Sequence, residues 1–147
     1  MAHINVEGTD VFYYYGKNVP SMKNLFHFST KTGRKYPDKR WKEYEGWLSP
    51  QLQADLRKFR SLIDPDRPVR LHVAFHRDSR RRADYINLMQ GVADLMVSNG
   101  LLDDDDSTHL VPVFESMTLD RDNPGFAFYV EQGEIDEVTG RLLDGNV

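Results

Sequence analysis

A chain of 147 residues, of which 39% are hydrophobic and 12% aromatic, has the length of one domain and enough apolar side chains for a packed core. No apolar run approaches the roughly 20 residues of a membrane span, no basic segment precedes an apolar one near the start, and there is no cysteine for a disulfide, a metal site or a nucleophile. The net charge of −4 does not exclude nucleic acid, because residues 1–102 carry 17 basic and 11 acidic side chains, whereas residues 103–147 carry 2 and 12. We expect a cytoplasmic protein without membrane contact. The basic part of the chain could bind nucleic acid, and the alternative explanation of the uneven charge is a solvated surface that ends in an acidic tail.

The first half of the chain predicts strands followed by helices. Residues 4–15 are rich in valine and aromatic residues and predict a strand, with a turn near Gly8. Residues 26–28 alternate as a short strand, and residues 32–35 form a turn with cations at its tip. Residues 38–62 have apolar side chains at helical spacing, and Ser49-Pro50 predicts that one helix ends and a second begins there.

The second half predicts a strand at residues 69–75, where apolar and polar side chains alternate. The arginine loop, residues 77–82, follows. After it comes an amphipathic helix with Asp84 at its N-cap and Gly100 just past its end. Strands are predicted at residues 108–117, where Pro112 indicates an edge or a bulge, and at residues 125–131. The helix has its apolar stripe at Tyr85, Leu88, Met89, Val92, Leu95 and Met96.

This order of elements predicts the α+β class, with a small mixed β-sheet packed by helices in a single domain. We place the domain at residues 1–132. Residues 133–147 are acidic, contain glycine and hold few apolar groups, so we expect a frayed or disordered tail.

Carboxylates at both ends of this amphipathic helix are the candidate metal ligands. Phosphodiester hydrolysis uses carboxylates to hold Mg²⁺, which activates water and neutralises charge on the phosphate. Asp84 precedes the helix and Asp103–Asp106 follow it, but about 16 helical residues span roughly 24 Å. The two groups would meet only if the chain after Gly100 folded back along the helix. The alternatives are that Asp84 only caps the helix and that the aspartate run is a solvated loop.

Two segments resemble the core of the RusA-type Holliday junction resolvases: RRADYINL at residues 81–88 and GLLDDD at residues 100–105. The pattern of that family is a run of arginines, Asp-x-Asp-Asn-Leu, a helix, a glycine, three residues and Asp-Asp. Upstream, PSMKN at residues 20–24 and GRKY at residues 33–36 resemble the Pro-Ser-x-x-Asn segment and the Gly-Arg hairpin of the family. The similarity extends over residues 19 to 117.

The resemblance implies a RusA-like fold and a small homodimeric endonuclease, of a kind common in phages and prophages, that resolves four-way DNA junctions with Mg²⁺, or with Mn²⁺ in its place, in DNA recombination and repair. Asp84 would be its first catalytic carboxylate and Asp105 its last, with Asp104 as a further metal ligand and Asn87 as the neighbouring amide. Its location would be the cytoplasm of a bacterium or a phage-infected cell. The residues expected to contact DNA are Lys23, Arg34, Lys35, Arg77, Arg80, Arg81 and Arg82.

Two positions depart from the family pattern. Ile86 replaces the second carboxylate, and Gln90 stands where a lysine is common. Either another acid (Asp103, Asp104 or Asp78) completes the site, or the protein binds junctions without cleaving them. A third alternative is an unrelated small phage protein whose basic turn and acidic loop bind a protein partner.

Three consecutive tyrosines, Tyr13 to Tyr15, have two interpretations. Their rings are suited to stacking on splayed bases. Packing within the core and the sheet is the alternative, and the one that we favour.

Overall fold

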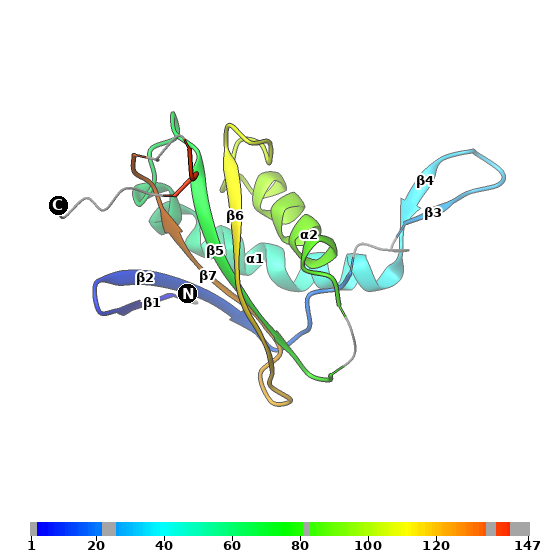
Figure 1. The fold of residues 1–147 in the computed structure, drawn as a ribbon. Coiled ribbons are helices and arrows are strands. Elements are labelled where there is room, and N and C mark those ends of the chain that lie inside the picture. The colour runs from blue at the N-terminus through cyan, green and yellow to red at the C-terminus, as the bar shows by residue number, and fades with distance from the viewer. Residues whose placement is uncertain (1–2, 22–25, 81–82, 135–137, 142–147) are drawn as a thin grey trace.

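The computed structural model describes residues 3–21, 26–80, 83–134 and 138–141, and these form one small α+β domain, as predicted (Figure 1). None of the helices within these ranges is long and apolar enough to cross a membrane. The elements in chain order are β1 (His3–Val6), β2 (Thr9–Tyr15), β3 (Phe26–Phe28), β4 (Lys35–Pro37), α1 (Lys39–Ser61), β5 (Val69–Arg77), α2 (Tyr85–Ser98), β6 (Leu110–Leu119) and β7 (Gly125–Glu131).

Five strands form one mixed sheet in the order β1-β2-β7-β5-β6. Neighbouring strands are antiparallel, except that β5 and β6 are parallel. Pro112 lies on the edge strand β6, where the missing N–H removes no hydrogen bond from the sheet interior. Pro112 itself is in regular register with Leu71, and the register of β6 shifts only further along, between Val73 and Phe75 of β5, so of the two predicted alternatives at Pro112 the edge is confirmed.

The parallel pairing of β5 and β6 places α2. Parallel neighbours need a crossover, and α2 provides it. The helix therefore begins at the end of the sheet where β5 finishes and ends where β6 begins (Figure 1). This connection fixes which loops lie together: the loop between β5 and α2 at one end, and the loop between α2 and β6 at the other.

The core lies between the helices and one face of the sheet (Figure 1). Alternate residues of each strand point to this face, and on β5 these are Leu71, Val73 and Phe75, all fully buried. On β2, Phe12 and Tyr14 are fully buried in the same way. The predicted stripe of α2 is confirmed, because Leu88, Met89, Val92, Leu95 and Met96 are buried and Tyr85 packs partly against the core.

The predicted break at Ser49-Pro50 is wrong, because α1 is one helix from Lys39 to Ser61. Pro50 is exposed, and it is flanked in the helix by Leu48 and Leu52, which are fully buried. A proline inside a helix costs about 3 kcal/mol, whereas burying the two leucines stabilises the helix by about 1.5–3 kcal/mol each. Tertiary packing therefore outweighs the local signal at Pro50.

The ends of α2 are where the sequence predicts them. Asp84 occupies the N-cap position in an extended conformation, although its side chain makes no capping hydrogen bond. Gly100 follows the C-cap with a φ of 82°, and the N–H of Leu101 donates to the carbonyl of Met96 at 2.9 Å. A glycine adopts this left-handed conformation without steric cost, so it ends the helix here.

The tyrosine run divides between the two faces of the sheet. Tyr14 points into the core and donates a hydrogen bond to Asp55 of α1 at 2.9 Å. Burial raises the pKa of Tyr14, and the negative charge of Asp55 raises it further. Tyr13 and Tyr15 alternate with Tyr14 and point to the face without helices. Core packing is therefore confirmed for Tyr14, whereas Tyr13 and Tyr15 pack against each other on the open face of the sheet.

Candidate functional site

Two open hollows lie at the end of the sheet where β5 leads into α2, and their lining residues follow one another in the sequence. One has a volume of about 530 Å³ and the other of about 390 Å³. The first is lined by Asp84, Tyr85, Ile86, Asn87 and Phe114, and the second by Arg77, Ser79, Arg80, Ala83, Met117, Thr118 and Leu119. The crossover thus gathers the described part of the arginine loop and the first predicted catalytic residues at one end of the fold.

Asp84 and Asn87 form a pair on the first turn of α2. The Nδ2 of Asn87 donates to Oδ2 of Asp84 at 3.3 Å, and the carboxylate is exposed. The predicted neighbourhood of amide and carboxylate is therefore present. Between them Ile86 exposes 74% of its surface, so a branched apolar side chain stands where the family pattern has a second carboxylate.

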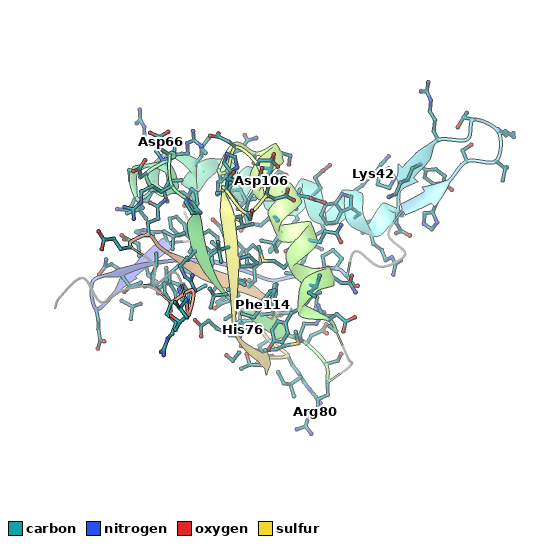
Figure 2. All side chains as sticks on the ribbon, turned by 45° about the horizontal axis from the view of Figure 1, so that its top comes forward. Lys42, Asp66, His76, Arg80, Asp106 and Phe114 are labelled. Carbon is teal, nitrogen blue, oxygen red and sulfur yellow. The ribbon has the colours of Figure 1, made fainter. Side chains whose placement is uncertain are left out.

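Arg77 has a structural role at this end. Its Nη1 donates to the carbonyl of Val19 at 2.7 Å, which ties the segment after β2 to the end of β5. Partial burial lowers the pKa of the Arg77 guanidinium, and the negative charge of Asp78 acts in the opposite direction. Arg80, by contrast, is exposed and points away from the fold (Figure 2). The predicted DNA contacts Lys23, Arg81 and Arg82 lie outside the described residues.

Asp104 and Asp105 lie at the opposite end of α2, in the loop that also contains Asp106 (Figure 2). The 14 residues of α2 span about 21 Å. The structure therefore does not bring Asp84 together with Asp104 or Asp105 within one chain. Among the described residues, no three His, Asp or Glu side chains are grouped so that they could hold a metal ion.

The acidic loop after α2 is held by local contacts. The N–H of Asp105 donates to Oδ1 of Asp104 at 2.7 Å, and Arg60 of α1 donates to Asp103 at 3.4 Å. Partial burial raises the pKa of Asp94 on α2, and the charge of Asp105 raises it further. The acidic loop therefore lies near the later turns of α2, where Asp94 is, and not near Asp84 at the first turn.

Asp106 and His109 close this loop. Hydrogen bonds from Thr108 and His109 lower the pKa of Asp106 to about 2, and the bond to Asp106 raises the pKa of His109 above its ordinary value of 6.5. We expect an NMR titration of His109 to give a pKa above 6.5 that falls in Asp106→Asn. Because the folded-state pKa is raised, protonated His109 stabilises the loop fully below pH 6.5, and this contribution is lost as the pH rises through the folded-state value.

Asp122→Asn is the control for this titration, because exposed Asp122 follows the far end of β6 from His109. A wild-type pKa of 6.5 or lower for His109 would contradict the contact.

Arg34 and Lys35 lie on the hairpin of β3 and β4, which projects from the body beyond the start of α1 (Figure 1). Gly33 has a φ of 66° in the turn, and the N–H of Ser29 donates to the carbonyl of Arg34 at 2.8 Å. The predicted turn with cations at its tip is confirmed. Both cations are exposed, so the hairpin is a second basic surface, separate from the arginine loop.

Three residues of interest were missed by the sequence reasoning. Asp94 gave no signal, because its proximity to Asp105 depends on the path of the chain after Gly100. The ring of Phe114 packs against that of Tyr85, tilted by 35° with 5.0 Å between the ring centres, in the hollow beside Asp84. His76 adjoins Tyr15 on the face without helices. The alternation of β5 placed His76 on the face opposite Phe75, and only the strand order shows that Tyr15 lies close to it.

The chain matches no protein-family model and no curated protein. The family resemblance of residues 81–88 and 100–105 therefore remains a proposal, which the geometry of the site supports only in part.

Proposed function

We propose that the protein is a Mg²⁺-dependent endonuclease of the RusA resolvase type that cleaves branched DNA such as four-way junctions, with Mn²⁺ as a substitute metal. The observation that carries this proposal is the gathering of Arg80, Asp84 and Asn87 around two open hollows at one end of the sheet. Cations that grip phosphate beside an exposed carboxylate are the elements that hydrolysis of a phosphodiester requires.

The described residues that surround Asp84 within one chain do not make up a binding site for Mg²⁺. Asp84 has an amide and an isoleucine as its neighbours on α2, and the other predicted ligands, Asp104 and Asp105, lie at the far end of the helix. A site that combines these carboxylates requires a second copy of the chain. A two-fold dimer with antiparallel α2 helices would place Asp84 of one copy near the acidic loop of the other, and would create two equivalent sites.

The edge of the sheet supports such a dimer. Strand β6 has one neighbour within the described sheet, so its other edge is unpaired, and this strand has the partly exposed side chains Phe114 (36%) and Leu119 (40%). Ile86 lines the same hollow as Phe114. Unpaired strand edges with exposed apolar side chains are surfaces that another chain covers.

The second candidate function is binding of branched DNA without cleavage. The exposed Ile86 favours it, because an isoleucine cannot bind Mg²⁺ and a site with fewer carboxylates holds the metal less tightly. In both candidate functions the arginine loop contacts the phosphates of the DNA, so one test of DNA binding applies to both.

That test compares Arg80→Gln with Arg67→Gln. Each variant removes one positive charge from an exposed loop, but Arg67 lies at the opposite end of β5. We expect a junction-binding titration at several salt concentrations to give a log–log slope that is smaller by about 1 for Arg80→Gln, and unchanged for Arg67→Gln. Equal slopes for both variants would mean that the loop does not contact DNA.

A further inference from the structure

The face of the sheet without helices carries one organised group of side chains, at the same end as the arginine loop. The register pairs Tyr15 with Gly125, Gly125 with His76, and His76 with Thr118, so these four residues form one row across β2, β7, β5 and β6. The adjacent row contains Tyr13, Ala127 and Ala74. The β7 position of each row is therefore a glycine or an alanine, so no bulky side chain on β7 covers the tyrosine rings of β2.

Contacts hold this group in place. The rings of Tyr13 and Tyr15 lie 5.4 Å apart with a tilt of 35°, and the ring of Tyr15 meets His76 edge-on at 5.1 Å. The hydroxyl of Tyr15 lies 3.4 Å from Nε2 of His76, and Thr118 Oγ1 lies 3.1 Å from Nδ1 of the same ring. Tyr15 nevertheless exposes 37% of its surface. Its ring is thus oriented by the fold and still accessible.

An exposed cation lies near the group. Arg80 lines the hollow that also includes Thr118, the neighbour of His76, whereas the guanidinium of Arg77 is bound to the carbonyl of Val19. Figure 2 shows His76 and Arg80 toward the same end of the fold, away from Asp106. Burial raises the pKa of the Tyr15 hydroxyl, and the negative charge of Asp120 raises it further. A strand with its bases on the tyrosines would therefore carry its phosphates toward Arg80.

We propose that Tyr13 and Tyr15 form a stacking surface for unpaired bases of branched DNA. This inference rests on the proposed function, and it adds the part of the substrate that the face would bind: one or two nucleotides released from pairing at the branch. Aromatic rings stack on any base, because every base has a π-face, so the surface recognises single-stranded character and not sequence.

The face also contains an aromatic pair that provides the control. Tyr129 stacks on His72 at 4.4 Å with an angle of 6° between the rings, and His72 is bridged by Glu115 and Glu131. A ring that is already covered, between two carboxylates, does not accept a base beside a phosphate. Tyr129→Leu therefore removes a tyrosine from the same face without removing the proposed surface.

The test uses a four-way junction with a short single-stranded flap that contains 2-aminopurine, and the same junction fully paired. We expect the wild-type protein and Tyr15→Phe to quench the 2-aminopurine fluorescence, whereas Tyr15→Leu and Tyr13→Leu lose the quenching. The leucine variants should bind the flap junction about tenfold more weakly and bind the paired junction as the wild type does. Circular dichroism melting of each variant shows that it is folded.

Quenching by the leucine variants equal to that of the wild type would overturn the inference, as would a loss caused by Tyr129→Leu alone. Salt-sensitive binding of the paired junction without any quenching would defeat the stacking surface and leave the proposed function standing. Failure to bind either junction would defeat both.

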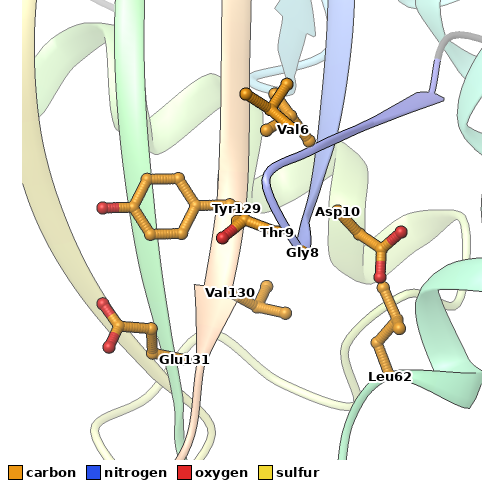
Figure 3. A pocket seen from close by; sticks show the side chains of 9 residues that line it. Val6, Gly8, Thr9, Asp10, Leu62, Tyr129, Val130 and Glu131 are labelled. Carbon is orange, nitrogen blue, oxygen red and sulfur yellow. The ribbon is translucent and has the colours of Figure 1, made fainter.

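The opening between β2 and β7 carries no second inference. These strands pair only from Phe12 to Tyr15, and the groove beyond has a volume of about 610 Å³ (Figure 3). Its carboxylates are already engaged, since Asp10 lies 2.7 Å from His3 and Glu131 bridges to His72. Nothing in the described part of the chain shows what would occupy it.

Discussion

Replacing Asp84 with asparagine should lower the rate of junction cleavage by at least about 100-fold, because the change removes the negative charge that the metal requires. The side chain keeps its size and its place on the first turn of α2, so folding and DNA binding should persist. The measurement is the initial rate of nicking of a labelled four-way junction in saturating Mg²⁺. Asp66→Asn is the matched control, since Asp66 is an exposed aspartate at the opposite end of the sheet.

Mixing two inactive variants tests whether the carboxylates of one metal site belong to one chain or to both chains of a dimer. If Asp84 and Asp105 act together across a dimer, Asp84→Asn and Asp105→Asn should each be inactive, and refolding them together should restore about a quarter of the wild-type sites. If both residues acted within one chain, the mixture would stay inactive. Activity of Asp84→Asn equal to that of Asp66→Asn would remove Asp84 from the site altogether.

The largest expected effect on stability comes from Gly125→Ala. Gly125 is buried at the start of β7 with a φ of 153°, and an added Cβ would lie 2.0 Å from the carbonyl oxygen of Tyr14. Backbone atoms of a paired strand cannot move aside as a flexible side chain can. We expect a loss of about 4 kcal/mol or more in the free energy of unfolding, measured by denaturant titration, or failure to fold.

Gly46→Ala is the control for this prediction, and the opposite change in stability is expected. Gly46 lies on the exposed surface of α1, and nothing stands within 4 Å of an added Cβ. The alanine should stabilise the helix by about 1 kcal/mol. A loss below about 1 kcal/mol for Gly125→Ala would show that β2 and β7 approach less closely than described.

Local sequence patterns predicted most of the fold. The alternation of apolar and polar side chains predicted β5, and the capping residues Asp84 and Gly100 predicted both ends of α2. The pattern failed at Pro50, because the burial of Leu48 and Leu52 depends on tertiary contacts that a local rule does not contain. The strand order, with β7 between β2 and β5, likewise depends on long-range pairing that no local signal encodes.

The sequence predicted which residues of the candidate site are neighbours on one helix, but not which residues of different elements come together. The neighbourhood of Asp84 and Asn87 follows from their spacing of three residues on a helix. The separation of Asp84 from Asp105 follows from helix length, and the loop after Gly100 stays near Asp94 and near Arg60 of α1. The contact of Tyr15 with His76 joins residues 61 positions apart, and only the pairing of both β2 and β5 with β7 brings them together.

Cleavage of a labelled four-way junction beside a matching linear duplex, with Mg²⁺ or Mn²⁺, tests the central claim most directly. The proposed endonuclease predicts paired symmetric nicks in the junction, few or none in the duplex, and none in either substrate without a divalent metal. Salt-sensitive binding of the junction with no nicking in either metal would contradict the endonuclease and leave the non-cleaving junction-binding protein. Neither binding nor nicking would contradict both.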